Sequence, residues 1–453
     1  MTCSEVPASE LSLTWGQQAI WDAMKALGAY DHQFNLRWTL ALPTPHPIPR
    51  VLAALEWIVD RHESLRTLYR GEDGVATQRL LERLDIPLHW RPVGTQRGET
   101  DRAAADLAEE LCKRSFHHGD EAPLRVGLLH SDDEVTHVVL AISHMAADND
   151  GLARVADELL GRLEASELAL PPPAQPRQIA ALQSTASWLA RGERATGYWI
   201  ETLRAAPPME APPRVADERS PRFWRGLLTS RPLLGAVGCL ARTGGISTTS
   251  VLLAAVGSAL GTLTGSRRPC VMLMCSNRTR EPFRSTISPV ALEGILSFDI
   301  GGEDGGQTEG ANAASGFLAV ARRAWDASLL AYRYAQYDKP ALTRAIARAD
   351  GFRSGMHRTC WFNDLRLERR PQEARPAVDD QQTGAFTWMD FTHEQGDAAL
   401  AFHVYDHADT LQITLTADTR VVGPDAIEGV LRDVEQLIMD AAIAAATPGD
   451  MHV

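Results

Sequence analysis

A histidine stands at the end of an apolar run, and a helix begins four residues after it. Residues 135–142 (VTHVVLAI) are rich in β-branched and large aliphatic side chains, which is typical of a buried β-strand. The sequence continues as SHMAADNDG over 143–151, and residues 148–150 are all of types that cap helix N-termini. Apolar side chains with helical spacing follow at positions 152, 155, 159, 160 and 163. These patterns predict a strand, a tight turn and a helix, with His144 held at the strand end.

His144 and Asp148 carry groups suited to general base catalysis. Imidazole titrates near neutral pH, so it can take a proton from an attacking amine, alcohol or thiol. A buried carboxylate at Asp148 would need a partner such as arginine and would then hold the turn that carries the histidine. A histidine that only packs or caps a helix fits the same spacing. The pattern by itself therefore leaves a catalytic and a structural interpretation open.

The length and composition are those of an ordinary globular protein. With 453 residues, the chain can form two or three average domains or one pseudo-duplicated domain. The longest apolar stretch, residues 251–261, is too short to span a bilayer and predicts a buried helix. The N-terminus shows no charged-then-apolar signal pattern. We therefore expect a cytoplasmic protein without membrane association.

Charge and cysteine spacing disfavour several classes of partner and cofactor. A formal net charge of −13 disfavours nucleic acids and anionic membrane surfaces as partners. The six cysteines show no paired spacing and no cluster with histidine, so we expect reduced thiols and no metal site. The sequence has no GxGxxG after a predicted strand, no HExxH and no GxSxG. Dinucleotide, zinc-protease and serine-hydrolase chemistry thus find no support.

One proline-rich stretch divides the chain. Residues 171–176 (PPPAQP) form a stiff, extended connector and are the clearest domain boundary in the sequence. We expect an N-terminal lobe over residues 1–176, and a linker helix followed by a C-terminal lobe over 177–453. The second lobe repeats the mixture of helices and strands of the first. Its expected elements are helices at 249–263, 313–336 and 424–442, and strands at 270–276, 399–405 and 411–416.

The segment 143–151 resembles the HHxxxDG signature of condensation domains from nonribosomal peptide synthetases. His144 matches the second, catalytic histidine and Asp148 matches the aspartate, while the Glu-Leu pair at 158–159 falls where the family's helix carries Glu-Leu. Ser143 replaces the first histidine, and Asn149 replaces the glycine. A second alignment is open, in which the Asp-Gly at 150–151 follows a two-residue insertion. We prefer Asp148 because it preserves the spacing to both His144 and Glu158.

Further segments resemble the family's motifs and occur in the family's order. The second motif, RHExLRT, is matched at its defining positions, and the others are weaker individually. The matching segments are SLTWGQQAIW at 12–21, RHESLRT at 61–67, APLRV at 122–126, YW at 198–199, SNR at 276–278, YDKP at 337–340 and WFN at 361–363. The resemblance therefore extends over most of the chain.

The resemblance implies a fold class and a set of site residues. The fold class is α/β, with two chloramphenicol-acetyltransferase-like lobes in a V-shaped pseudo-dimer, each a mixed sheet covered by helices. The active site would lie in a tunnel at the lobe interface, and a crossover segment within 364–398 would reach from the second lobe to the first. His144 would be the catalytic base. Structural support of the active site would come from Asp148, Arg278, Ser143 and Asn149, with Arg278 as the partner of Asp148.

The resemblance also implies a function and its partners. It points to a free-standing condensation enzyme of nonribosomal peptide or related natural-product biosynthesis, since the chain carries no carrier attachment motif. Such an enzyme joins an acyl or aminoacyl thioester on a carrier protein to a free or carrier-bound amine or alcohol, giving an amide or an ester. No cofactor would be bound intrinsically, because the carrier protein supplies the phosphopantetheine arm. We expect a monomer.

Two other functions stay open at this stage. The first is a catalytically silent condensation-like module that recruits partners to a carrier-bound peptide, and the changes at Ser143 and Asn149 are of the kind such a module carries. The second is an acyltransferase that uses coenzyme A directly. Carrier proteins are usually acidic, so docking would need a basic patch. The residues Arg366, Arg369 and Arg370 could provide that patch, or could lie in a solvated loop.

Other charged residues are expected to be structural or solvent-exposed. Arg61, Glu63 and Arg66 predict an ion network that does not touch substrate. His117 and His118 precede a strand and lack a following helical pattern, in contrast to His144. We therefore expect both of these histidines to be exposed to solvent.

Overall fold

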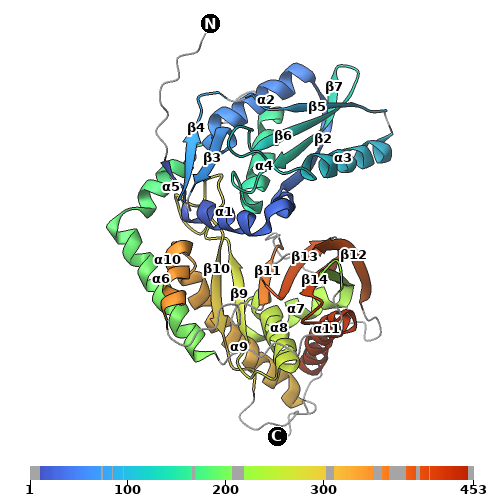
Figure 1. The fold of residues 1–453 in the computed structure, drawn as a ribbon. Helices are drawn as coiled ribbons and strands as arrows, with labels where there is room; N and C mark the ends of the chain where they lie inside the picture. Colours follow the sequence, from blue (N-terminus) through green and yellow to red (C-terminus); the bar gives the residue numbers. More distant parts are fainter. Residues whose placement is uncertain are drawn as a thin grey trace. The chain divides into compact units, whose positions relative to one another are not determined.

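The computed structural model describes residues 11–72, 75–83, 85–94, 96–165, 169–206, 219–301, 311–349, 360–366, 384–393, 398–407 and 409–446. The chain forms two compact units, coloured along the sequence in Figure 1 and described here one at a time. Unit 1 runs to Arg191 and also contains the later segment Ser276–Leu292. Unit 2 contains Gly192–Cys275 and Glu293–Val453.

The division between the units differs from the expected boundary at 176/177. The proline-rich connector stays with unit 1, where its Gln175 is hydrogen-bonded. The Gln175 side-chain amide donates to the carbonyl of Arg61 at 3.0 Å, and its side-chain oxygen accepts the N–H of Glu63 at 3.0 Å. The next helix, α5 (Pro176–Gln183), then buries Ile179 completely. The chain passes to unit 2 within α6 (Ala186–Ala205), which contains the Tyr-Trp pair expected in the linker helix.

A four-stranded mixed sheet forms the centre of unit 1. Its strands lie in the order β2 (Leu36–Pro47), β7 (Glu134–Ile142), β6 (Leu124–Ser131) and β5 (Leu88–Pro92). Strand β7 is antiparallel to β2 and β6, and β5 runs parallel to β6. The strand predicted at 135–142 is therefore confirmed as an interior strand.

Helices cover both faces of this sheet. Val138, Leu140 and Ile142 share a core with α2 (Ile48–Arg61) and α4 (Asn149–Glu164). The alternate side chains of β7, at 139 and 141, pack with α3 (Arg97–Cys112). Successive side chains of a strand point to opposite faces, so burial on both faces explains the continuous apolar run.

A smaller antiparallel sheet, helix α1 and two 3-10 helices also belong to unit 1. Its order is β1 (Leu11–Ser12), β4 (Val75–Leu80) and β3 (Thr67–Glu72), and η2 (Glu63–Arg66) leads into β3. Helix α1 (Trp15–Leu27) is followed by η1 (Gly28–Phe34). Thr14 and Gln17 form a capping box at the start of α1.

Unit 2 is built on a seven-stranded mixed sheet. The strand order is β10 (Leu292–Ser297), β9 (Cys270–Cys275), β11 (Cys360–Asp364), β13 (Leu400–His407), β14 (Thr410–Asp418), β8 (Phe223–Ser230) and β12 (Ala385–His393). Strand β11 is parallel to β9 and β13, and the pairs from β13 to β12 are antiparallel.

Four helices of unit 2 share one hydrophobic core with this sheet. They are α7 (Arg231–Gly244), α8 (Thr248–Thr264), α9 (Ala311–Arg333) and α11 (Pro424–Ala446). The shorter helix α10 (Lys339–Arg348) buries Leu342, which is not part of that core. Helix α8 is buried nearly throughout, as its apolar sequence predicted. All six elements expected in the second half are present as α8, β9, α9, β13, β14 and α11, and only their ends differ.

The expected crossover segment 364–398 is described in part. Strand β12 within it pairs with β8 and lies at the edge of the unit 2 sheet. Residues 367–383 and 394–397 lie outside the described residues.

Among the helices that the structure describes, none by itself is long and apolar enough to cross a membrane; α7 and α8 reach that criterion only as a pair, across a bend of 106°. The described residues also contain no group of three His, Cys, Asp or Glu side chains that could hold a metal ion.

Candidate active site

The turn after β7 presents His144 in a defined tautomer. The N–H of Ser143 donates to the carbonyl of Pro123 at 2.9 Å, and the N–H of Ala146 donates to the carbonyl of Ser143 at 2.9 Å. His144 Nδ1 lies 2.8 Å from the carbonyl oxygen of Ala147. A carbonyl oxygen only accepts, so Nδ1 carries the proton and Nε2 is left as the basic nitrogen. The turn thus fixes which nitrogen can receive a proton.

The surroundings of His144 favour the neutral ring. Burial lowers its pKa, and the nearby carboxylate of Asp148 opposes this effect without cancelling it. The ring of Phe34, at the end of η1, lies 5.8 Å from the imidazole between centroids. A neutral imidazole held on one side by a carbonyl is the form that a general base requires.

Asp148 is the N-cap of α4 and a buried acceptor. Its side chain is 6% exposed, and Oδ1 accepts from the N–H of Gly151 at 2.9 Å and from Arg278 Nη2 at 2.6 Å. Its Oδ2 accepts from the N–H of Val290 at 3.1 Å. Burial alone would raise the pKa of Asp148, but the charge of Arg278 and these hydrogen bonds together bring that pKa below its usual value. Asp148 is therefore ionised and joins two parts of unit 1 that are far apart in sequence.

Arg278 holds together the segment 276–292 of unit 1, which is bonded to Asp148. Besides Asp148, it donates to three backbone carbonyls, those of residues 283, 286 and 288, at 2.8 to 3.0 Å. The preceding Asn277 has a φ of 58°, a left-handed conformation that Asn tolerates better than most residues. Its side chain donates to the carbonyl of Val290 at 3.1 Å. The pairing of Asp148 with Arg278 is present as expected.

The structure also distinguishes the two alignments of the histidine motif. Asp148 is buried and caps α4, whereas Asp150 has a half-exposed side chain and lies 3.6 Å from Arg278 Nε. Asp148 therefore has the environment of a structural aspartate, and the alignment through it is the better one. Asn149 lies exposed at the first position of α4.

Ser143 is fully buried, and its partner is a histidine that the sequence analysis placed in solvent. His118 Nε2 and Ser143 Oγ are hydrogen-bonded at 2.8 Å, and Oγ also accepts the N–H of Met145 at 3.2 Å. His117 is exposed as expected, but the expectation for His118 is wrong. Burial lowers the pKa of His118. The cause of this inward position lies seven residues later, in Arg125.

Arg125 is a buried arginine that sequence reasoning missed. Its side chain is 1% exposed and forms an ion pair with Glu121 at 2.7 Å. It donates to the backbone carbonyls of residues 111, 114 and 115, and its guanidinium lies 3.8 Å from the ring centroid of Phe116. These bonds fold the segment between α3 and β6 against the sheet. His118 is part of that segment and is therefore held inward.

The expected network of Arg61, Glu63 and Arg66 is replaced by separate interactions. Arg61 pairs with Glu158 at 2.9 Å, and Glu63 pairs with Arg177 at 2.9 Å. Arg66 donates to a backbone carbonyl at 2.6 Å. The prediction of one network is wrong, because each of the three side chains bonds to a different partner. Glu158 also accepts from the buried His62 at 2.8 Å and thereby joins α2 to α4.

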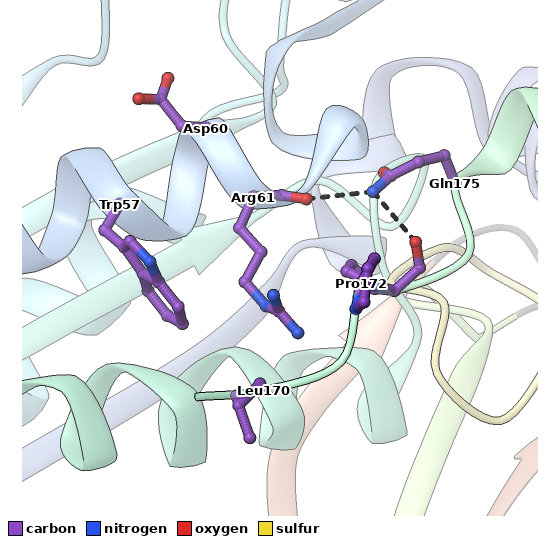
Figure 2. A pocket seen from close by; sticks show the side chains of 7 residues that line it. Trp57, Asp60, Arg61, Leu170, Pro172 and Gln175 are labelled. Atoms are coloured by element: carbon purple, nitrogen blue, oxygen red, sulfur yellow. Dashed lines mark hydrogen bonds between the residues drawn. The ribbon is translucent and has the colours of Figure 1, made fainter. Parts of the chain in front are cut away.

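A depression of about 430 Å³ lies beside Arg61 in unit 1, and Figure 2 shows the side chains that line it. It is lined by residues of α2 and of the proline-rich connector: Trp57, Asp60, Arg61, Leu170, Pro172, Pro173 and Gln175. The Gln175 amide donates to the carbonyls of Arg61 and Pro173, at 3.0 and 3.3 Å. Arg61 is already bonded to Glu158 and to the Pro171 carbonyl. This depression contains none of the expected site residues, and its polar groups hold the connector in place.

The structure does not support Arg366 as part of the basic patch expected at Arg366, Arg369 and Arg370. Arg366 Nε donates to Asp364 Oδ1 at 2.7 Å, and its Nη2 donates to Oδ2 of the same carboxylate. Its side chain is 11% exposed, so it is not an exposed cation, and that part of the prediction is wrong. Arg369 and Arg370 lie outside the described residues.

Among known proteins, the chain is similar to peptide synthetases. Cyclosporin synthetase simA of Tolypocladium inflatum is 27% identical over 257 residues, which cover 53% of this chain and 2% of the synthetase. The chain thus spans a small part of that relative's length. The sequence also matches the family described as Condensation domain over residues 8–290.

Solved structures have the same fold. The structure described as the molecular basis for condensation domain-mediated chain release from the enacyloxin polyketide synthase matches with a TM-score of 0.75 and 19% identity, covering 100% of this chain and 86% of that one. A variant of the starter condensation domain of rhizomide synthetase RzmA, solved with C8-CoA and Leu-SNAC, matches with a TM-score of 0.68 and 15% identity, covering 98% of both chains. Condensation domains have two chloramphenicol-acetyltransferase-like lobes, so the expected α/β fold class is confirmed. Because the family match spans more than half of its length, the chain belongs to the condensation-domain family.

Proposed function

We propose that this chain joins an acyl or aminoacyl thioester, held on a carrier protein through phosphopantetheine, to an amine or alcohol acceptor. The product is an amide or an ester, in keeping with the condensation role of the family in nonribosomal peptide synthetases. The observation that carries the proposal is the state of His144, whose Nδ1 donates to the Ala147 carbonyl at 2.8 Å and whose pKa is lowered by burial. Its Nε2 is then suited to accept a proton at neutral pH.

The proposed reaction has a simple proton balance. The acceptor nitrogen or oxygen attacks the carbonyl carbon of the thioester, and His144 Nε2 takes the proton that the acceptor loses. As the C–N or C–O bond forms, the C–S bond breaks, and the proton passes from His144 to the leaving sulfur, which departs as a thiol. General base assistance of this kind contributes about 10²- to 10⁴-fold in rate. Holding both reactants in line contributes a comparable or larger factor.

Asp148 and Arg278 have a supporting role in this proposal. Neither needs to touch substrate, because the Asp148 carboxylate is used by Arg278, Gly151 and Val290. Capping α4 and holding the 276–292 segment keeps the His144 turn in one conformation. Ser143 and the exposed Asn149 flank the base without supplying a second one.

The donor would arrive on a carrier from outside these 453 residues, because the sequence has no phosphopantetheine attachment motif. A second candidate donor is an acyl-coenzyme A, which is favoured by the complex of the related RzmA starter domain with C8-CoA. Both donors present a thioester on a pantetheine arm, so the same role of His144 serves for either. An assay that compares carrier-loaded and coenzyme A-loaded acyl groups separates them.

The experiment that tests the proposal is turnover with His144→Ala beside the unaltered protein. Product formation from a panel of acyl-carrier donors and amine or alcohol acceptors is followed by mass spectrometry, and circular dichroism checks that the fold is retained. We expect His144→Ala to lose at least about 10²-fold in kcat. Equal turnover of the two proteins would refute the role of His144. Binding of acyl-carrier without turnover by the unaltered protein, across donors and acceptors, would instead support the silent recruiting module.

A further inference from the structure

A half-buried histidine, His118, is hydrogen-bonded to the buried serine that precedes the proposed base. Ser143 precedes His144 in sequence, and its side chain is fully buried. Its Oγ is hydrogen-bonded to His118 Nε2 at 2.8 Å and accepts the N–H of Met145 at 3.2 Å. The hydroxyl of the residue before His144 is therefore bonded to the backbone of the residue after it and to the ring of His118. Because Ser143 has no exposed surface, it is unsuited to act as a nucleophile itself.

His118 is held rigidly enough to orient that hydroxyl. Its carbonyl accepts the N–H of Tyr69 on β3 at 2.8 Å, and its ring makes edge contacts with Trp21 and Tyr69, with centroids 6.3 and 6.4 Å apart. Arg125 fixes the chain around it from the other side, through Glu121 and three carbonyls. A serine hydroxyl has several rotamers, so a fixed partner is needed to hold one of them.

The same segment also bonds to the backbone of the turn. The carbonyl of Pro123 accepts the N–H of Ser143 at 2.9 Å. The turn that carries His144 is thus attached to the 116–123 segment by one backbone bond and one side-chain bond. A histidine is expected at position 143 from the family motif, and here the imidazole beside that position comes from His118 instead.

We propose that His118 is a positioning residue that acts through Ser143 to fix the turn of His144, and thereby the direction of its basic nitrogen. This inference deepens the proposed function, and its catalytic consequence rests on that function. The structural coupling of His118 to His144 is independent of the proposed function, because the tautomer and orientation of His144 can be measured without turnover. A displacement of a catalytic group by about 1 Å can cost about 10²-fold in rate, so a bond this close to the base has a measurable effect.

The test uses the full chain, five variants at positions 117, 118 and 143, and the His144→Ala variant. His118→Phe removes the nitrogen but keeps an aromatic ring, and Ser143→Ala removes the hydroxyl; the double variant combines them. His118→Gln keeps a nitrogen at similar reach and serves as the conservative replacement. His117→Phe is the matched control, because His117 is the adjacent exposed histidine. Long-range ¹H–¹⁵N spectra of histidine-labelled protein report the tautomer of His144, whose signal is assigned by its absence in His144→Ala.

We expect His118→Phe and Ser143→Ala each to shift the His144 signals and to lower kcat by about 10- to 100-fold, with KM little changed. The double variant should be no worse than the more severe single variant, because both remove one and the same coupling. His118→Gln should recover most of the loss, and His117→Phe should match the unaltered protein.

Unchanged His144 signals in His118→Phe, or additive effects in the double variant, would overturn the inference. If Phe at 118 prevents folding, the spectra of His118→Gln and Ser143→Ala decide the question by the same criteria. Should His144→Ala keep full turnover while His118→Phe still shifts the His144 signals, the proposed function fails and the coupling stands. Should His144→Ala be inactive while His118→Phe changes neither signals nor kcat, the proposed function stands and the role of His118 fails.

Discussion

Replacing Asp148 with alanine removes a carboxylate on which three donors depend. The side chain is 6% exposed and accepts from the N–H of Gly151, from Arg278 and from the N–H of Val290, at 2.9, 2.6 and 3.1 Å. In the Asp148→Ala variant, the guanidinium of Arg278 stays buried beside three carbonyls but loses its buried counter-charge. Helix α4 also loses its N-cap. The variant should therefore weaken unit 1 at the His144 turn and at the 276–292 segment together.

The size of the effect follows from the two contributions. Breaking a buried ion pair by removing one partner costs about 3–5 kcal/mol. Loss of an N-cap costs about 1 kcal/mol. The two overlap, because Gly151 and Arg278 share the same oxygen, so we expect a loss of about 4 kcal/mol in the free energy of unfolding of unit 1. Asp148→Asn keeps the cap oxygen but removes the charge, and we expect a loss of about 2 kcal/mol.

Hydrogen exchange read by mass spectrometry measures this locally, and urea unfolding gives the free energy. The exchange rates of peptides from β7, α4 and residues 276–292 should all rise in Asp148→Ala. Asp150→Ala is the matched control, since its half-exposed side chain lies 3.6 Å from the same arginine. We expect the control to lose less than about 1 kcal/mol. Equal losses in Asp148→Ala and Asp150→Ala, or no change in exchange at 276–292, would show that the carboxylate does not hold the two segments together.

Three further predictions follow from other buried groups. Burial lowers the pKa of His144 below its ordinary value of 6.5. We therefore expect kcat/KM to stay constant through neutral pH and to fall only below pH 6.5, where the imidazole of the folded protein takes a proton. A fall in kcat/KM that begins above pH 7 would contradict a neutral, buried ring. Glu158→Gln should destabilise unit 1 by about 3 kcal/mol in urea unfolding, because the buried His62 and Arg61 lose their shared carboxylate. Glu164→Gln, at an exposed position of the same helix, is the control and should have little effect. Arg125→Met should raise the rate of hydrogen exchange over residues 111–121 and lower the free energy of unfolding by about 3 kcal/mol. The reason is that three backbone carbonyls and Glu121 lose their donor. Unchanged exchange over these residues would contradict the organising role of Arg125.

Several elements could be predicted because their signals are local. The apolar run at 135–142, the capping residue Asp148 and the helical spacing after it each depend on neighbours within one or two turns of chain. Side-chain type also predicts which residues are buried in three elements of the second half, the helix at 249–263 and the strands at 399–405 and 411–416. The domain boundary was harder, because a proline-rich stretch is stiff wherever it lies. Bonds from the connector to Arg61, Glu63 and Ser285, all in unit 1, show that it stays with this unit.

The candidate site shows the same division. The expected pairing of Asp148 with Arg278 came from resemblance, because 130 residues separate them and no local pattern connects them. His118 was expected in solvent, because it precedes a strand and no helical pattern follows it. Arg125, seven residues later, draws the segment inward through bonds to backbone carbonyls, and carbonyls are present at every residue and so leave no sequence pattern.

The sequence by itself determined the strand, turn and helix around His144, the capping role of Asp148 and the membership of the condensation-domain family. Those properties depend on side-chain type and short-range spacing, which the sequence records directly. The tertiary structure decided which nitrogen of His144 is basic, which carboxylate Arg278 uses and which residue stands behind Ser143. These depend on distances of a few ångströms between segments far apart in the chain, and packing alone brings such segments together.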